Sequence, residues 1–247
     1  MEKSKINIAI DGVAGSGKGT YSKILAKILG YNYLEAGFLY RVLTNYFLKN
    51  NITTDNIKDD FENIINTIKI EIIDNQYYLN SKIIEKSELR TPTVNKWVAE
   101  FGKIEKLKDY IINIQKDIVK NTKGIIAEGR NMANDVMPDA DLKIYVWANP
   151  TVRANRRRTQ YESYKNISQE DAILEINNRD EIDFNHKRPL IRPTLAYDLY
   201  DVTINTSKDN PQDNFAKFIG ALPMNLQIEI YKNNFNKIED FLKNRDF

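Results

Sequence analysis

The residue types between positions 12 and 20 point to phosphate chemistry. They read Gly-Val-Ala-Gly-Ser-Gly-Lys-Gly-Thr, and four of the chain's ten glycines lie in these nine positions. Glycine lets the backbone curl until several N–H groups face one point, and N–H groups gathered at a helix N-terminus bind anions. Lys18 adds a positive charge for the outer phosphates of a nucleotide. We name residues 12–20 the phosphate loop.

The spacing of Gly12, Gly17 and Lys18 matches the pattern G-x-x-x-x-G-K, which requires a strand before the loop and a helix after it. Residues 6–10 read as a buried strand, and residues 18–29 read as an amphipathic helix. Gly19 and Thr20 complete a G-K-G-T ending, which resembles the small nucleoside monophosphate kinases. In such proteins we expect no direct protein ligand to the metal, because Mg²⁺ is held by nucleotide phosphates and water.

Arginine is the scarcer base, with 11 arginines against 25 lysines, and eight of the arginines lie between Arg130 and Arg192. Arginine binds phosphate and carboxylate in a bidentate manner, so this clustering favours an anion site over a generic charged surface. Four of these arginines lie on one predicted helix, at positions 153, 156, 157 and 158. An anion among them would relieve their repulsion, and a solvated basic face is the alternative.

Polar side chains also follow the predicted strands. Glu128, Arg130 and Asn131 come directly after the strand 124–127, and ligands of open α/β sheets bind at the carboxyl ends of strands. Arg41 is expected one turn into the helix 38–49, after a loop. Arg179 and Asp183 are four residues apart, hence on one helix face, where they either pair with each other or hold a phosphate and a ribose hydroxyl.

Along the chain, short apolar runs alternate with stretches whose apolar residues recur at helical spacing. This alternation favours an α/β fold with a parallel sheet. Residues 68–84 interrupt the alternation and read as an antiparallel hairpin or three-stranded patch. The stretch 226–247 reads as an amphipathic helix that packs on the domain rather than binding a partner. The predicted strands are 6–10, 32–34, 124–127, 142–147 and 202–205, and the predicted helices are 18–29, 38–49, 104–119, 151–164, 168–179 and 214–219.

Composition excludes several classes of protein. The chain has 247 residues, a net charge of +2, no cysteine and one histidine, which excludes disulfides and makes a zinc site improbable. No 18-residue apolar run and no signal-peptide pattern are present, so we expect a cytoplasmic protein without membrane or nucleic-acid partners.

Taken in order, the motifs resemble the bacterial cytidylate kinases. They are I-A-I-D-G-x-A-G-S-G-K-G-T, x-x-G-x-x-Y-R, R-T-P-x-V, x-G-R-x-M, P-D-A-x-L-K-I, R-R-R and R-D-x-x-D-x-N, over about residues 5–206. The resemblance implies a three-layer α/β/α fold with a central five-stranded parallel sheet. It implies a kinase domain at 1–221, with its core at 1–34, 120–150 and 200–221, a monophosphate-binding part at 35–119 and a lid at 151–199. Residues 222–247 would be a helical extension.

The resemblance also implies an activity and a set of site residues. Such enzymes are phosphotransferases that move the γ-phosphoryl group of ATP to CMP or dCMP with Mg²⁺. Lys18, Arg156 and Arg157 would be catalytic. The ATP-binding residues would be Gly12, Val13, Ala14, Gly15, Ser16, Gly17, Lys18, Gly19 and Thr20. The acceptor-binding residues would be Arg41, Lys108, Arg130, Asn131, Arg179, Asp183 and His186.

Departures from the family pattern gather on the acceptor side. The family has Ser or Thr at Ala36, and Asp at Glu35, Glu128 and Asn131. It also has Ser at Ala99 and Arg at Lys108 and His186. Because an amide both donates and accepts, we expect Asn131 to relax the discrimination between cytosine and uracil.

Other functions stay open at this stage. A kinase of the same fold with another acceptor, such as UMP, and a non-catalytic nucleotide-binding protein are the alternatives. A GTPase is disfavoured because no D-x-x-G occurs in the chain. A nucleic-acid-binding module is disfavoured because basic and acidic residues interleave. We expect a monomer.

Overall fold

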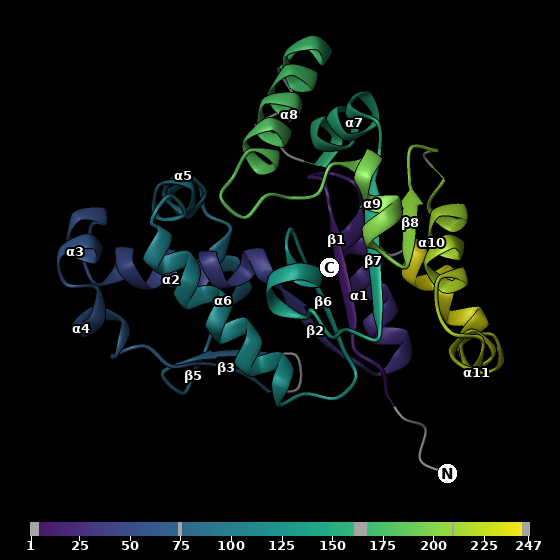
Figure 1. Cartoon of the computed structure of the whole chain (residues 1–247), viewed down its shortest axis with the longest axis horizontal. Helices are drawn as coiled ribbons and strands as arrows, with labels where there is room; N and C mark the ends of the chain where they lie inside the picture. Colours follow the sequence, from purple (N-terminus) through teal and green to yellow (C-terminus); the bar gives the residue numbers. More distant parts are fainter. Residues whose placement is uncertain (1–4, 74–75, 161–166, 209, 244–247) are drawn as a thin grey trace. The chain divides into compact units, whose positions relative to one another are not determined.

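The computed structural model describes residues 5–73, 76–160, 167–208 and 210–243, which divide into two compact units (Figure 1). Within these ranges, the first unit comprises residues up to Tyr33 and from Gly124 onward, and the second comprises Leu34–Lys123. Along these residues, no helix is both long enough and apolar enough to cross a membrane.

A five-stranded parallel sheet in the order β2-β6-β1-β7-β8 organises the first unit, as predicted. β1 is the central strand and pairs in parallel with β6 and β7, with Ile10 opposite Glu128 and Ile144. Since all strands run the same way, the residues that follow β1, β6 and β7 emerge at one edge of the sheet. The strands are β1 (Ile8–Gly12), β2 (Asn32–Glu35), β6 (Ile125–Gly129), β7 (Leu142–Trp147) and β8 (Val202–Asn205).

Different elements cover the two faces of this sheet, which gives the predicted three-layer α/β arrangement (Figure 1). Ile8 and Ile10 belong to an apolar core formed with α1 (Lys18–Leu29), α10 (Pro211–Gly220) and α11 (Met224–Lys243). Successive side chains of a strand point to opposite faces. On the other face, the turn η2 (Met132–Val136) packs against β1 and β6, and α9 (Pro193–Leu199) packs against β7 and β8.

The helix α11 packs on the domain, as predicted. Leu226 and Ile230 are buried in the main core, and Ile238 packs against it. Tyr231 is half exposed. The predicted core positions Phe235 and Leu242, and the end of the expected helix at 244–247, lie outside the described side chains and residues.

Two helices follow β7 in the first unit: α7 (Pro150–Gln160) and α8 (Gln169–Phe184). They pack against each other through Ala154, Ala172 and Ile176, all buried. Ser168 caps α8 by accepting a hydrogen bond from the Asp171 N–H.

The second unit has its own helices and a small antiparallel sheet. The sheet β3-β4-β5 confirms the three-stranded patch predicted within 68–84. Phe47 of α2 packs against Phe101 of α5, with ring centroids 5.0 Å apart. The elements are α2 (Ala36–Lys49), α3 (Thr54–Asp59), α4 (Phe61–Ile65), β3 (Ile70–Ile73), β4 (Gln76–Leu79), β5 (Lys82–Ile83), η1 (Lys86–Leu89), α5 (Pro92–Phe101) and α6 (Glu105–Lys120).

Several predicted boundaries were wrong. β1 begins two residues later than predicted and runs to Gly12, so the phosphate loop starts inside the strand. β2 passes directly into α2 at Ala36, so no loop separates them, whereas Arg41 lies one turn into the helix, as predicted. α8 continues five residues past Arg179, which places Asp183 on the same helix as Arg179. The predicted residues 161–164 of the helix at 151–164 lie outside the described residues.

Four helices were not predicted from the sequence: α3, α4, α5 and α9. Three of them have clear start signals. Thr53 forms a capping box with Asn56, and prolines begin α5 and α9 after Thr91 and Arg192. At five to ten residues, these helices are too short for apolar periodicity to reveal them.

Candidate active site

The phosphate loop joins β1 to α1 and depends on glycine at both ends. A Cβ atom on Gly12 would lie 1.9 Å from the Val146 carbonyl oxygen, so no other residue fits beside β7. Gly17 precedes α1 with φ at +85°, in the left-handed region that glycine adopts without strain. Lys18 is then the first residue of the helix, where backbone N–H groups lack helical partners and attract anions.

Side-chain donors hold four carbonyl groups of the phosphate loop from outside. In a trans peptide, the carbonyl and the following N–H point in opposite directions. Holding these carbonyls therefore turns the N–H groups of Val13, Gly15, Ser16 and Gly17 away from the donors, and the Ser16 N–H donates within the loop to the Val13 carbonyl at 3.4 Å. The contacts are Arg130 Nη1 to Gly12 O at 3.1 Å, Arg153 Nη1 to Ala14 O at 3.1 Å, Arg156 Nη1 to Gly15 O at 3.3 Å and Thr206 Oγ1 to Ser16 O at 2.7 Å.

Lys18 is buried among charges of both signs. Its Nζ lies 3.6 Å from Glu128 Oε2. Burial and the neighbouring Arg130 lower the pKa of Lys18 to about 8, although Glu128, Asp11 and Asp183 act to raise it. Burial disfavours the charged form of Lys18. An anionic ligand beside its ammonium group would therefore stabilise that charge.

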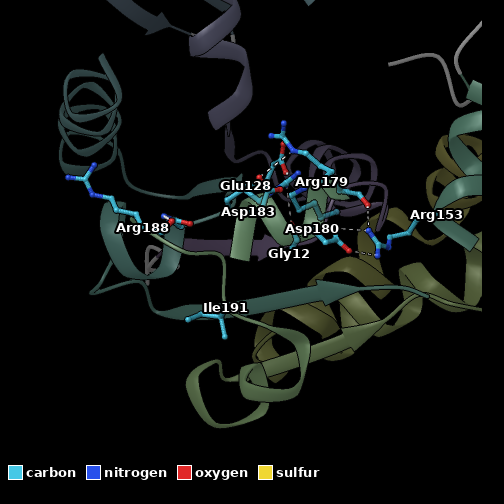
Figure 2. A network of polar contacts seen from close by, with 12 residues as sticks. Gly12, Glu128, Arg153, Arg179, Asp180, Asp183, Arg188 and Ile191 are labelled. Atoms are coloured by element: carbon cyan, nitrogen blue, oxygen red, sulfur yellow. Dashed lines mark hydrogen bonds and ion pairs between the residues drawn. The ribbon is translucent and has the colours of Figure 1, made fainter. Parts of the chain in front are cut away.

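Asp183 links two of the predicted acceptor arginines. Its Oδ2 lies 2.9 Å from Arg130 Nε, and its Oδ1 lies 3.3 Å from Arg179 Nε (Figure 2). The Arg179–Asp183 pair is thus the local ion pair that the i, i+4 spacing allowed. Since the exposed fraction of the Arg179 side chain is 51%, its guanidinium is open to solvent as well.

Asn131 has a definite orientation. Its Nδ2 donates to Asp135 Oδ2 at 3.0 Å and to the Arg188 carbonyl at 2.9 Å. Turning the amide over would set its oxygen against these two oxygens. The Oδ1 atom is buried and has no hydrogen-bond partner among the described residues. The expectation that either end of this amide is available was therefore wrong, because only the acceptor end remains.

Asp11 organises the turn that carries Asn131, and the sequence analysis missed it. Its carboxylate is fully buried and accepts hydrogen bonds from the N–H groups of Met132 at 2.7 Å and Ala133 at 2.9 Å. Tyr200 donates to the same carboxylate at 3.0 Å. Burial raises the pKa of Asp11, while these three hydrogen bonds act to lower it. An aspartate at the end of a strand predicted as buried was the signal.

The arginines of α7 do not all gather around one point. Arg153 is 2% exposed and forms a bidentate ion pair with Asp180 at 3.0 and 2.6 Å. Arg156 donates to the Thr206 carbonyl as well as to the phosphate loop. The interpretation of four arginines around a shared anion was wrong for these two, because main-chain oxygens and Asp180 take their hydrogen bonds. Arg157 is half-buried.

Arg153, Asp180 and Thr206 were therefore missing from the predicted site. The sequence placed Arg153 among the α7 arginines but did not distinguish it from its neighbours. The only signal for Asp180 was its position in the R-D-x-x-D string, next to Arg179. Thr206 directly follows β8 and offered no signal.

Two of the predicted acceptor residues, Arg41 and Lys108, lie in the second unit. Arg41 donates to the Leu89 carbonyl at 3.0 Å and to Asn95. Lys108 pairs with Glu105 at 2.7 Å within α6. Arg90, which the sequence analysis quoted only within the R-T-P motif, lies 3.8 Å from Glu35 in the same unit.

The last predicted acceptor residue, His186, follows α8 in the first unit. Its Nδ1 accepts a hydrogen bond from the Arg188 N–H at 3.2 Å. The segment after it is anchored to the sheet, because Tyr145 donates to the Ile191 carbonyl. Arg188, labelled in Figure 2, lies 3.9 Å from Asp135.

Comparison with known proteins identifies the family. The family model described as cytidylate kinase matches residues 8–213, which includes the phosphate loop and the whole parallel sheet. The chain belongs to the cytidylate kinase family. Cytidylate kinases are phosphotransferases, and the match spans the parallel sheet, the phosphate loop and the antiparallel sheet β3-β4-β5.

Curated relatives agree with this assignment. A cytidylate kinase of Fervidobacterium nodosum is 37% identical over 195 residues, covering 78% of this chain and 87% of that protein. A cytidylate kinase of Clostridioides difficile is 36% identical over 214 residues, covering 85% and 96%. One from Thermosipho africanus is 34% identical over 227 residues, covering 91% and 98%.

Proposed function

We propose that this protein transfers the γ-phosphoryl group of ATP to CMP or dCMP. The observation that carries the proposal is the phosphate loop, whose carbonyl groups are held outward at the N-terminus of α1 beside the buried Lys18 cation. Phosphoryl transfer needs alignment and charge neutralisation more than covalent help from the protein. Membership of the cytidylate kinase family supports CMP as the acceptor.

On the donor side, residues 12–20 bind the ATP phosphates, with the N–H groups of Val13, Gly15 and Gly17 turned away from the side chains that hold the loop. Lys18 places its ammonium on the outer phosphates, and the loss of solvent around this cation is compensated by the bound anion. Arg157 neutralises charge on the transferring group from the lid, which we assign to residues 151–199, and Arg156 adds its charge from beside the phosphate loop, whose backbone its hydrogen bond holds. Arg156 already contacts the phosphate loop at Gly15, so it reaches the same end of the sheet as Lys18.

The residues that we assign to the acceptor are found in both units. Arg41 and Lys108 belong to the monophosphate-binding part, assigned to residues 35–119. From the first unit, Arg130 holds the acceptor phosphate, Asp183 and Arg179 face the phosphate and sugar, Asn131 faces the base, and His186 also belongs to the acceptor-binding set. An acceptor phosphate is a ready nucleophile, so the reaction needs no strong base.

Asn131 favours cytosine over uracil. Its Nδ2 hydrogens have acceptors in Asp135 and the Arg188 carbonyl, so Oδ1 is the atom left for a base, which meets this buried oxygen once the side chains around it make room. This oxygen accepts hydrogen bonds and cannot donate them. The 4-amino group of cytosine donates, whereas the 4-carbonyl of uracil only accepts. We therefore expect CMP to be preferred over UMP.

Magnesium is the metal that this reaction uses, and it neutralises charge on the phosphates when it is bound. Among the described residues, no three His, Cys, Asp or Glu side chains are grouped to hold a metal ion. Mg²⁺ is commonly bound through substrate phosphates, water and one or two carboxylates. Glu128, whose carboxylate lies beside Lys18, is the residue that would accept hydrogen bonds from its water ligands.

The proposal is tested by ADP formation from ATP and Mg²⁺ with equal concentrations of CMP, dCMP, UMP, AMP and GMP. The expected result is turnover with CMP and dCMP, and slower turnover with UMP by about tenfold, the value of one hydrogen bond in a buried site. Turnover with another monophosphate alone would contradict the assigned acceptor. ATP binding without turnover of any monophosphate would indicate a non-catalytic protein.

A further inference from the structure

The buried Arg153–Asp180 pair has no place in the reaction as described above, yet it touches the phosphate loop. Arg153 extends from α7 and Asp180 from α8, and the two side chains are 3% and 10% exposed. Figure 2 shows Arg153 with its guanidinium turned toward Asp180. One arginine thus connects two helices of the assigned lid to the backbone of the donor site.

All three nitrogens of this guanidinium are engaged. Nε donates to the Ala148 carbonyl at 2.8 Å, Nη2 donates to Asp180 at 2.6 Å, and Nη1 donates both to Asp180 at 3.0 Å and to the Ala14 carbonyl at 3.1 Å. Four of the five N–H groups of the side chain are therefore in use, in a buried place. Arg153 is not available to a nucleotide phosphate.

The contact with Ala14 controls one N–H group of the phosphate loop. Because the Ala14 carbonyl faces Arg153, the N–H of Gly15 in the same peptide plane faces the opposite way. Gly15 has φ at +74° and contacts Arg153 closely, since a Cβ atom on it would lie 3.2 Å from the Arg153 Cβ. Rotation of this peptide would turn a carbonyl oxygen, instead of an N–H, toward an incoming phosphate.

Asp180 is held in place independently of the loop. It lies on the face of α8 that also carries Ala172 and Ile176, at four-residue intervals, and this face packs against Ala154 of α7. Arg153 precedes Ala154, so the packing of the two helices sets where the guanidinium lies. The orientation of the Ala14–Gly15 peptide is therefore set by α7 and α8.

We propose that Arg153, held by Asp180, is a positioning residue that keeps the Ala14–Gly15 peptide turned for phosphate and so couples the helices α7 and α8 to ATP affinity. The inference rests on the proposed function in taking the phosphate loop as the ATP site. It assigns Arg153 a role through the backbone, distinct from the direct role of Arg157.

The chain offers a matched control for this pair. Arg192 and Glu181 form a second bidentate pair, at 3.1 and 3.0 Å, and Glu181 is the neighbour of Asp180 on α8. This pair is half-exposed and lies outside the donors to the phosphate loop carbonyls. Substitutions there change the charge of the same helix by the same amount without removing a loop contact.

The test measures ATP affinity by calorimetric titration with no acceptor present, in the full chain. The variant Arg153→Met with Asp180→Leu removes both charges together, a change that often leaves stability near that of the parent protein. We expect ATP to bind about tenfold more weakly, the value of one lost hydrogen bond to a site that must bind charge. The control variant Arg192→Met with Glu181→Leu is expected to bind ATP as the parent does.

A second variant, Arg153→Lys, keeps the charge opposite Asp180 but cannot reach its three acceptors with one ammonium group. It too is expected to weaken ATP binding, with the KM for CMP unchanged, so that the loss is confined to the donor side. Circular dichroism and the melting temperature report whether each variant is folded.

If the Arg153→Met, Asp180→Leu variant is folded and binds ATP as tightly as the parent, the inference is overturned. If that variant does not fold, parent-like ATP affinity of the Arg153→Lys variant overturns it. An equal rise in the KM values for ATP and CMP would also overturn it, because it would indicate a general structural role. A parent chain that binds ATP without phosphorylating CMP would contradict the proposed function alone, since the binding comparison contains no acceptor.

Discussion

The phosphate loop and the turn at Arg130–Val136 are held in opposite ways. In the phosphate loop, side chains from other elements donate hydrogen bonds to the backbone carbonyls. Backbone N–H groups are then left to bind the ligand. In the turn, the buried Asp11 carboxylate accepts hydrogen bonds from backbone N–H groups. The side chains of Arg130 and Asn131 are then left to bind the ligand. The first region recognises through the main chain, and the second through side chains.

This difference bears on the departures from the family pattern that the sequence predicts. Main-chain recognition depends on the backbone path, which glycines and outside donors set, so it tolerates few changes in the loop. Side-chain recognition changes with each substitution, and the departure expected at Asn131 is of this kind. Substitutions in the two regions should therefore affect different properties of the protein.

Lys18 is the one side chain through which the phosphate loop itself acts, so its removal should have the largest effect. Lys18→Met is expected to lower kcat/KM by about 10³-fold, because a charge aimed at the transferring phosphoryl group is lost. It should also stabilise the fold. Folding lowers the pKa of Lys18 from 10.5 to about 8, which costs the folded state up to about 3 kcal/mol at neutral pH.

The sign of the stability effect follows from proton binding. The unfolded chain binds the Lys18 proton more tightly than the folded chain does, so the cost is full below pH 8 and disappears as the pH rises toward 10.5. The gain in melting temperature of Lys18→Met should therefore be larger at pH 7 than at pH 10. Lys27→Met, at an exposed position of the same helix, is the control. Equal or lower stability of Lys18→Met at pH 7 would contradict the charge environment described for Lys18.

The same pKa predicts how ATP binding varies with pH. Lys18 in the free protein is mostly charged at pH 7 and mostly neutral at pH 9, so the KM for ATP should rise about tenfold between them. The KM for CMP should change less. Lys18→Arg keeps its charge across this range and should flatten the profile, whatever its absolute activity. A parent profile that is flat in KM for ATP would refute the prediction.

Asn131 tests the side-chain recognition of the turn. Asn131→Ala removes the oxygen assigned to the 4-amino group of cytosine, and the ratio of kcat/KM for CMP over UMP should fall by about three- to tenfold. Asp135→Asn is the sharper variant, because it removes the carboxylate that orients the Asn131 amide without changing its volume. It should lower the same ratio by letting the amide turn over. An unchanged ratio in both variants would remove Asn131 from base selection.

The smallest effect is expected at Tyr200, on the backbone side of the turn. Tyr200→Phe removes one of three hydrogen bonds to Asp11, while the two backbone N–H groups remain. The expected loss is about 1 kcal/mol of unfolding free energy, or a few degrees in melting temperature, with kcat/KM near the parent value. Tyr197→Phe is the exposed control. A large loss of activity would mean that Tyr200, rather than the backbone contacts, holds the turn.

Much of the fold followed from the sequence because its signals are local. The parallel strands, α1, and the antiparallel sheet within 68–84 were all predicted, since apolar runs and turn residues mark them directly. The short helices α3, α4, α5 and α9 were not, because they span less than three turns and carry little periodicity. β1 was displaced because Asp11 and Gly12 are not apolar, although tertiary contacts bury both.

The site, like the fold, has parts that follow from local sequence and parts that depend on tertiary contacts. The chain by itself determined the phosphate loop, because glycines at fixed spacing before a lysine and a helix impose their geometry locally. Only the tertiary structure decided which arginines are free to meet a ligand. Arg153 and Arg156 are alike in the sequence, but α8 places Asp180 against the first, and β8 places Thr206 against the second. Likewise, the orientation of the Asn131 amide depends on Arg188, 57 residues away, and contacts at that distance are not encoded in local pattern.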